Sequence, residues 1–123
     1  QEREIAANLR QNVELLRGML AKTKKQVSAW GGTFYFVYLP TWWRYANGNS
    51  GPFASERPEV LKAVRALGIP LIDILPAFEA HSDPLSLFPL GRFYHYNEQG
   101  HFRMNQLCLC CFIKIKICNF RNI

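Results

Sequence analysis

Apolar residues occur at the spacing of a helix over the first thirty positions of the chain. They follow one another at intervals of four, four, three and four residues: Ile5, Leu9, Val13, Leu16 and Leu20. Side chains at this spacing share one face of an amphipathic helix. The pattern predicts a helix over residues 2–29 that ends at Gly31 and Gly32, because consecutive glycines favour a left-handed turn.

Two continuously apolar segments follow, at residues 33–39 and 69–75. A short run that is apolar on both faces is typical of a buried parallel strand. Between these segments, residues 56–67 repeat the helical spacing, with Ser55 as the predicted N-cap. This alternation of helix and strand is typical of α/β proteins, so we expect a parallel sheet.

The remaining predicted elements are a loop and two helices. Residues 40–55 are rich in Gly, Asn and Ser, which predicts a loop after the first strand. A short helical piece is predicted over residues 77–81. A last helix is predicted over residues 98–106, with Asn97 as its N-cap.

The last 17 residues, 107–123, differ in composition from the first 106. They lack Ala, Gly, Pro, Val, Asp and Glu, which is typical of a frame-shifted segment, so we expect a globular body over residues 1–106 and an atypical tail. Alternating Ile and Lys at 113–117 predict a strand. The tail cysteines lack the paired C-x2-C of structural zinc sites, so no metal site is predicted, although a metal or redox site is the alternative. These cysteines are Cys108, Cys110, Cys111 and Cys118.

Charge and hydropathy exclude several classes of protein. The chain has 15 Lys and Arg against 9 Asp and Glu, a net charge of +6, and the tail supplies half of that excess. Without a basic stripe or a binding motif, this charge predicts no nucleic-acid partner. The 49% of hydrophobic residues excludes a disordered chain. No uncharged run approaches the roughly 20 apolar residues of a membrane-spanning helix, so no membrane segment is expected.

His95 has the context most typical of a chemically active side chain. It lies after a loop that contains Pro89 and Gly91, directly before the predicted helix start at Asn97. A histidine at such a place can point into a cleft, and imidazole titrates near neutral pH, so it can accept and return a proton. The alternative role for His95 is a hydrogen bond to the backbone of its own loop.

The segment at residues 88–101 reads Phe-Pro-Leu-Gly-Arg-Phe-Tyr-His-Tyr-Asn-Glu-Gln-Gly-His. It resembles the last conserved block of the SGNH (GDSL-type) hydrolases, in which the catalytic histidine precedes an x-Asn-x-x-Gly-[His/Tyr] helix start. The two predicted strands also resemble the last two α/β units of that family. The resemblance covers residues 2–106 and implies a three-layer α/β/α fold with a parallel sheet, flavodoxin-like and here incomplete. Residues 1–106 would then be the C-terminal portion of an SGNH hydrolase-like domain.

The resemblance also implies a chemistry. In the family, a serine of a Gly-Asp-Ser block attacks an ester carbonyl, and the histidine is the general base. Only His95 has a matching position here, because the chain contains no Gly-Asp-Ser. We expect the missing block to precede Gln1, which is not an initiator methionine, so no compartment is indicated. The resemblance therefore implies a fragment of a serine esterase, inactive alone, for a small-molecule or glycan ester and without a cofactor.

The acid that would orient His95 departs from the family pattern. The family commonly has Asp three residues before the histidine, and Arg92 stands at that position. Asp83, in the same loop, is a candidate for the orienting carboxylate, and capping of the loop before Pro84 is its alternative role. A backbone carbonyl is the other candidate partner for His95.

Three aromatic residues predict a possible substrate-binding wall after the first strand: Trp42, Trp43 and Tyr45. Coverage of the sheet edge is their alternative role. These aromatics, with Arg92 in place of the usual acid, support the alternative function of a non-catalytic carbohydrate-binding module. An O-acetyltransferase-type SGNH domain acting on polysaccharide is a further alternative. For Asp73, near the end of the second predicted strand, we expect a hydrogen bond to a loop amide.

Overall fold

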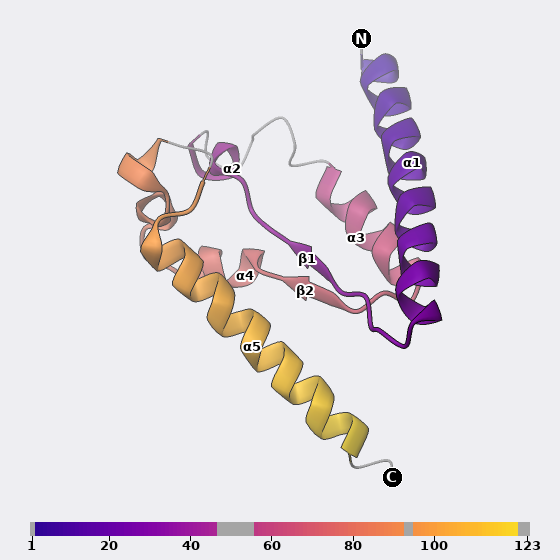
Figure 1. Ribbon diagram of the computed structural model, residues 1–123. Helices are drawn as coiled ribbons and strands as arrows, with labels where there is room; N and C mark the ends of the chain where they lie inside the picture. Colours follow the sequence, from indigo (N-terminus) through magenta and orange to yellow (C-terminus); the bar gives the residue numbers. More distant parts are fainter. Residues whose placement is uncertain (1, 47–55, 93–94, 121–123) are drawn as a thin grey trace. The chain divides into compact units, whose positions relative to one another are not determined.

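The computed structural model describes residues 2–46, 56–92 and 95–120, with the backbone alone at positions 2, 5 and 110–120 (Figure 1). The chain divides into two compact units. Unit 1 contains residues 1–36 and 53–71, and unit 2 contains residues 37–52 and 72–123. The elements follow in the order α1 (Glu2–Ala29), β1 (Phe36–Tyr38), α2 (Trp42–Ala46), α3 (Glu56–Ala66), β2 (Leu71–Asp73), α4 (Leu75–Glu79), the 3-10 helices η1 (Pro84–Leu87) and η2 (Pro89–Gly91), and α5 (Glu98–Phe120).

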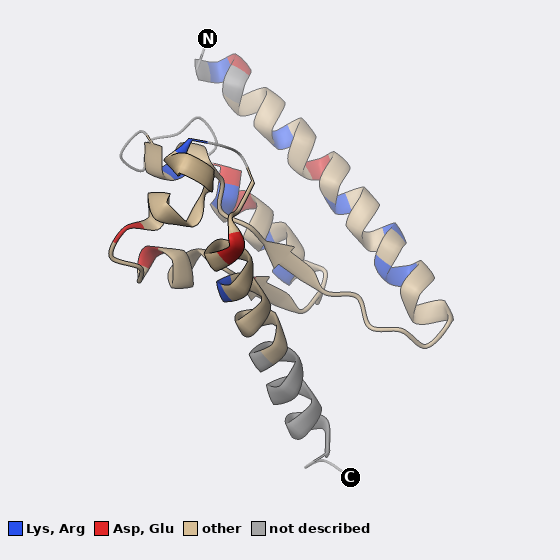
Figure 2. Cartoon of the chain, turned by 60° about the vertical axis from the view of Figure 1, so that its left-hand side comes forward, with Lys and Arg blue, Asp and Glu red and all other residues tan. Residues whose placement is uncertain are grey.

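Unit 1 is built on α1, and the sequence predicts this helix with the bounds that it has. α1 packs against α3, and Leu20, Val64 and Ile69 form a buried cluster. Basic and acidic residues occur along α1 (Figure 2), whereas its apolar residues Val13 and Leu20 are buried. The helix is therefore amphipathic, as its spacing of apolar residues predicts.

Both helices of unit 1 end at glycine. Gly31 has a φ of 81° and its amide donates to Ser28 O at 3.1 Å, which confirms the left-handed turn predicted after α1. Gly68 follows α3 with a φ of 63°. Lys24 Nζ donates to Leu67 O at 2.6 Å and to Gly68 O at 3.5 Å. The lysine thereby satisfies carbonyl groups at the C-terminal end of α3.

The strands β1 and β2 pair in parallel and form a two-stranded sheet in the described part of the chain (Figure 1). The amide of Phe36 donates to Pro70 O at 2.9 Å, and the amide of Ile74 donates to Tyr38 O at 3.1 Å. Each strand has three residues, fewer than the apolar segment that predicts it.

The predicted three-layer α/β/α, flavodoxin-like fold is wrong. The structure is 69% helix and 6% strand, and two short strands do not make the central layer of that architecture. The pairing is short for local reasons. Pro70 has no N–H to donate to a ladder, and Ile74 has helical backbone angles (φ −84°, ψ −18°) where α4 begins. In these two segments, apolar residues on both faces therefore reflect burial of the segment and do not show that the whole segment is an extended strand.

Unit 2 has a core rich in aromatic side chains. The rings of Phe78 and Phe88 meet edge to face, with their centroids 6.2 Å apart. η1 lies at the centre of the unit and contacts α2, α4 and α5. The largest fully buried residues of the unit are Phe78, Phe88, Ile74, Leu87 and Pro40.

The segment predicted as a loop at residues 40–55 begins with a helix. Trp42–Ala46 form α2, so the loop prediction is wrong for these positions. Residues 47–55 lie outside the described part of the chain, and so does the predicted N-cap Ser55.

α5 runs through the position where the composition changes. It begins at Glu98 as predicted, but it continues to Phe120, so the strand predicted at 113–117 is wrong. A helix satisfies its backbone groups internally, whereas a strand needs a neighbour. The frame-shifted origin of the tail stays a prediction, and the side chains of Cys110, Cys111 and Cys118 lie outside the described ones. No helix, over the positions that the structure describes, has the length and apolar character needed to cross a bilayer.

Candidate functional site

The start of α5 is tied to η1 by Asn97. Its Oδ1 accepts a hydrogen bond from the amide of Gly100 at 3.0 Å, which confirms Asn97 as the N-cap. Its Nδ2 donates to Ser86 O at 2.6 Å, and its backbone amide donates to Leu87 O at 3.0 Å. His95 is therefore two residues from a helix start that is fixed on both sides.

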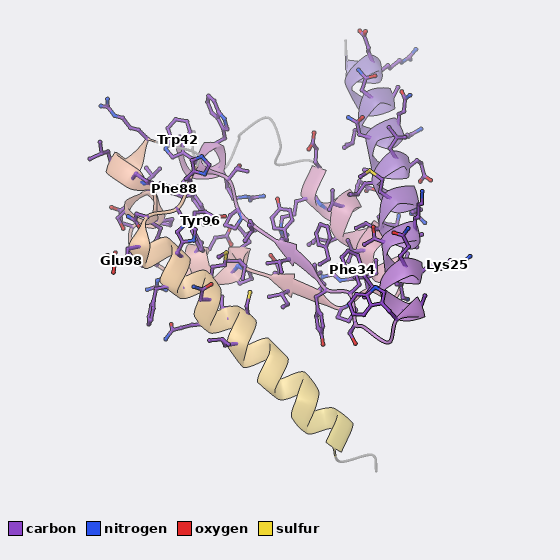
Figure 3. The ribbon with its side chains drawn as sticks, in the orientation of Figure 1. Lys25, Phe34, Trp42, Phe88, Tyr96 and Glu98 are labelled. Atoms are coloured by element: carbon purple, nitrogen blue, oxygen red, sulfur yellow. The ribbon has the colours of Figure 1, made fainter. Side chains whose placement is uncertain are left out.

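Tyr96 anchors the backbone next to His95. Its hydroxyl donates to Pro40 O at 2.5 Å, at the end of the segment that follows β1. Its ring lies 5.3 Å from the Phe88 ring, measured between centroids (Figure 3), and 5.0 Å from the Phe78 ring. Burial, and then the neighbouring tyrosines, raise the pKa of Tyr96 above the usual range of a phenol, so the hydroxyl keeps the proton that it donates.

His95 lines a cavity of about 290 Å³ in unit 2. The ring is exposed, so solvent and a ligand both reach it. The wall combines the segment after β1, the two residues before the N-cap and the first turns of α5: Leu39, Pro40, Thr41, His95, Tyr96, His101 and Met104. This arrangement suits proton transfer to a small, mostly apolar molecule, because the imidazoles of His95 and His101 lie on a wall without Lys, Arg, Asp or Glu among the described residues.

Asp83 lies beside His81. Its amide donates to His81 Nδ1 at 3.1 Å, and its carbonyl accepts a hydrogen bond from Ser86 Oγ at 2.7 Å. These backbone contacts place Asp83 before η1, the region of its alternative capping role. Among the described residues, no ion pair or hydrogen bond joins the Asp83 carboxylate to His95. Its role as the orienting acid stays a prediction.

The aromatic residues of α2 pack within unit 2. Trp42 Nε1 donates to Gly91 O at 2.6 Å, so the indole N–H already has a partner. The rings of Trp42 and Trp43 meet edge to face at 4.9 Å, and Tyr45 lies 6.0 Å from Phe88. These contacts, and the partial burial of all three side chains, show that the aromatic residues of α2 are packed within the unit. Their role in substrate binding stays a prediction.

Two other polar residues lie outside the His95 cavity. Asp73 Oδ1 accepts a hydrogen bond from the amide of Leu75 at 3.2 Å, so its partner is a neighbouring backbone amide as expected, but at the first residue of α4 and not in a loop. Arg92 is exposed after η2, and its amide donates to Pro89 O at 3.1 Å.

The cavity contains no serine from the described part of the chain. Ser28 lies in unit 1, and Ser86 Oγ is bound to Asp83 O. Ser82 is exposed next to His81 and is not a lining residue. Thr41 supplies an aliphatic hydroxyl group to the lining, and the hydroxyl of the other lining residue, Tyr96, donates to Pro40 O.

Sequence reasoning missed His101 and Met104 as lining residues of the His95 cavity. A signal for His101 was present, since the residue before an N-cap commonly packs on the fourth residue of the helix. Tyr96 and His101 have those positions, and their rings meet edge to face at 5.8 Å. Met104 follows His101 by three residues on the same face of α5.

No cluster of three or more His, Cys, Asp or Glu side chains able to hold a metal ion occurs among the residues that the structure describes. In comparisons with known proteins, no family model, curated protein or solved structure matches this chain.

Proposed function

We propose that His95 is the general base of an SGNH-type ester-cleaving or acyl-transferring site. The observation that carries the proposal is the exposed His95 on the wall of a cavity, two residues before the N-cap of α5. Asn97 and Tyr96 support it, because their hydrogen bonds hold the backbone on the C-terminal side of His95. A base must keep its place relative to the hydroxyl that it activates.

The chemistry follows from the need to activate a hydroxyl group. His95 takes the proton as the nucleophile attacks the ester carbonyl, and the resulting imidazolium then protonates the leaving alcohol. Since no described serine lines the cavity, the nucleophile of this proposal comes from outside the described residues. The 123-residue chain alone is therefore expected not to turn over esters.

The size of the cavity favours a small acyl group. About 290 Å³ is at the lower limit of ligand pockets, which run from roughly 300 to 1,000 Å³. Leu39, Pro40 and Met104 give the wall an apolar part. The proposed substrates are therefore small-molecule or glycan esters with a short acyl chain.

The test compares His95→Ala with His81→Ala in the full-length product of the gene that encodes this sequence. His95→Ala is expected to lower the rate of ester hydrolysis about 10²- to 10⁴-fold, because a positioned general base contributes that much. His81→Ala is the matched control, since His81 is a half-buried histidine of unit 2 outside the cavity, and it should leave the rate unchanged. The readout is the initial rate with acetyl, butyryl and octanoyl esters.

Two results would contradict the proposal. One is equal rates for the wild type and His95→Ala, or no hydrolysis of any ester by the full-length product. The other concerns the nucleophile: hydrolysis by the 123-residue chain alone, abolished by His95→Ala, would show that the chain supplies its own nucleophile.

A further inference from the structure

We propose that His95, His101 and Met104 form a binding site for a transition-metal ion, with copper as the ion that fits best. Two imidazoles and one thioether line the same cavity of about 290 Å³. Imidazole binds copper, zinc and nickel, and a thioether selects copper among them, above all Cu(I). The wall carries no carboxylate among the described residues, so the hard cations Mg²⁺ and Ca²⁺ are poor candidates.

The three groups come to the cavity from two adjacent segments. His101 and Met104 lie three residues apart on α5, so their side chains share one face of the helix. His95 reaches the cavity from the residues before the N-cap. Both histidines are exposed, which leaves an ion a path from solvent.

Tyr96 orders the site. Its hydroxyl is bound to Pro40 O, and its ring meets the edge of the His101 ring at 5.8 Å. A contact of this kind restricts the rotamer of His101 before any ion binds. Groups that orient metal ligands in this way commonly change metal affinity 10- to 100-fold when they are removed.

The ring nitrogens are available as ligands. Among the described residues, no hydrogen bond engages a ring nitrogen of His95 or His101, whereas His81 Nδ1 accepts a bond from the amide of Asp83. Among the residues that the structure describes, no Lys or Arg lines the cavity, so no fixed cation from them opposes the ion. Two imidazoles and one thioether leave a coordination position for water or for Thr41.

Copper binding does not depend on the proposed hydrolytic function. One consequence does rest on it: a copper ion on His95 occupies the nitrogen that would accept the proton, so bound copper inhibits the base. Copper binding by this chain, together with no ester hydrolysis by the full-length product of the gene, would therefore support this inference and contradict the proposed function.

The test is a titration of the full chain with Cu(II), and with Cu(I) under anaerobic conditions. All four cysteines are first replaced by alanine, because thiolates of the tail would compete for copper. Far-UV circular dichroism checks that each variant is folded. The electron paramagnetic resonance spectrum of Cu(II) is expected to show hyperfine coupling to two imidazole nitrogens.

Three variants identify the ligands in this background. His95→Ala and His101→Ala should each weaken Cu(II) binding at least 10-fold and remove one nitrogen coupling, and Met104→Leu should weaken Cu(I) binding more than Cu(II) binding. His81→Ala is the control and should change neither affinity. Unchanged affinity and nitrogen coupling in folded His95→Ala or His101→Ala, or no copper binding at about 100 µM in the cysteine-free chain, would overturn the inference.

Discussion

Tyr45 and Tyr96 are two half-buried tyrosines of unit 2 that differ in their hydroxyl groups. The Tyr96 hydroxyl donates to Pro40 O, whereas the buried Tyr45 hydroxyl has no hydrogen-bond partner within the described residues. A buried polar group without a partner costs roughly 1–3 kcal/mol, and a formed hydrogen bond contributes roughly 0.5–1.5 kcal/mol. Replacing each tyrosine with phenylalanine therefore compares the loss of a hydrogen-bonded hydroxyl with the loss of a hydroxyl that has no partner within the described residues.

Tyr96→Phe is expected to lower the free energy of unfolding by about 1 kcal/mol, because it removes the bond to Pro40 O. Tyr45→Phe should leave that free energy unchanged or raise it, because it removes an unpaired buried hydroxyl. Urea unfolding followed by circular dichroism measures both. Equal destabilisation by the two substitutions would show that the bond to Pro40 contributes nothing specific.

Local pattern alone predicts part of the candidate site. Asn97 as the N-cap and His95 two positions before it follow from neighbouring residue types, since capping depends on contacts within one helical turn. The bond from Tyr96 to Pro40 crosses 56 positions of the chain. No local pattern contains such a contact, and for the same reason the bond from Trp42 to Gly91 was not predictable.

At the scale of elements, helices are predicted well and strands poorly. α1 has its predicted bounds because its hydrogen bonds and its stop signal at Gly31 are all local. β1 and β2 are shorter than predicted because a strand extends only as far as its neighbour pairs with it. In the tail, the pattern predicts a strand but the structure has a helix. The alternating Ile and Lys residues lie in α5, which continues from its capped start.

Gly31→Ala and Gly18→Ala test what glycine does at the end and in the middle of α1. Gly31 has a positive φ, so alanine is strained there and should lower the free energy of unfolding by about 1 kcal/mol. Gly18 is exposed within the helix, with open space where an alanine methyl group would lie, so alanine should raise that free energy by roughly 0.5–1 kcal/mol. Thermal unfolding followed at the helical dichroism band measures both.

The essential result is that the two substitutions change the free energy of unfolding in opposite directions. Stabilisation by both substitutions would mean that the left-handed turn at Gly31 is not needed to end α1.

At the scale of the whole molecule, the order of helix and strand is predicted correctly but the architecture is not. Helix, strand, helix and strand follow one another as expected up to the end of β2, except that α2 adds a helix where a loop was predicted. A layered α/β fold needs further strands beside these two, and the described residues supply none. The number of strands in a sheet depends on how the whole chain assembles. The periodicity of a single segment therefore does not predict that number.

The stability of the molecule should fall at alkaline pH because of its two buried phenols. Burial raises the pKa values of Tyr45 and Tyr96 above the ordinary 10.0, so the folded protein keeps protons that the unfolded chain releases. The free energy of unfolding therefore falls as pH rises through about 10. The Tyr45→Phe/Tyr96→Phe double variant should lose less stability than the wild type between about pH 9 and pH 11, measured by urea unfolding. An identical loss in both proteins would contradict this assignment.

The hydrogen bond between Asn97 and Ser86 affects the conformational entropy of the chain. The side-chain nitrogen Nδ2 of Asn97 donates to Ser86 O, 11 positions away, and this bond closes the loop that carries His95. The entropy cost of closing a loop depends on the number of residues in it, and only weakly on their chemical identity. Side chains inside this loop, such as Arg92, can therefore be exchanged without weakening its closure, so the chemistry of the loop and its closure can change independently.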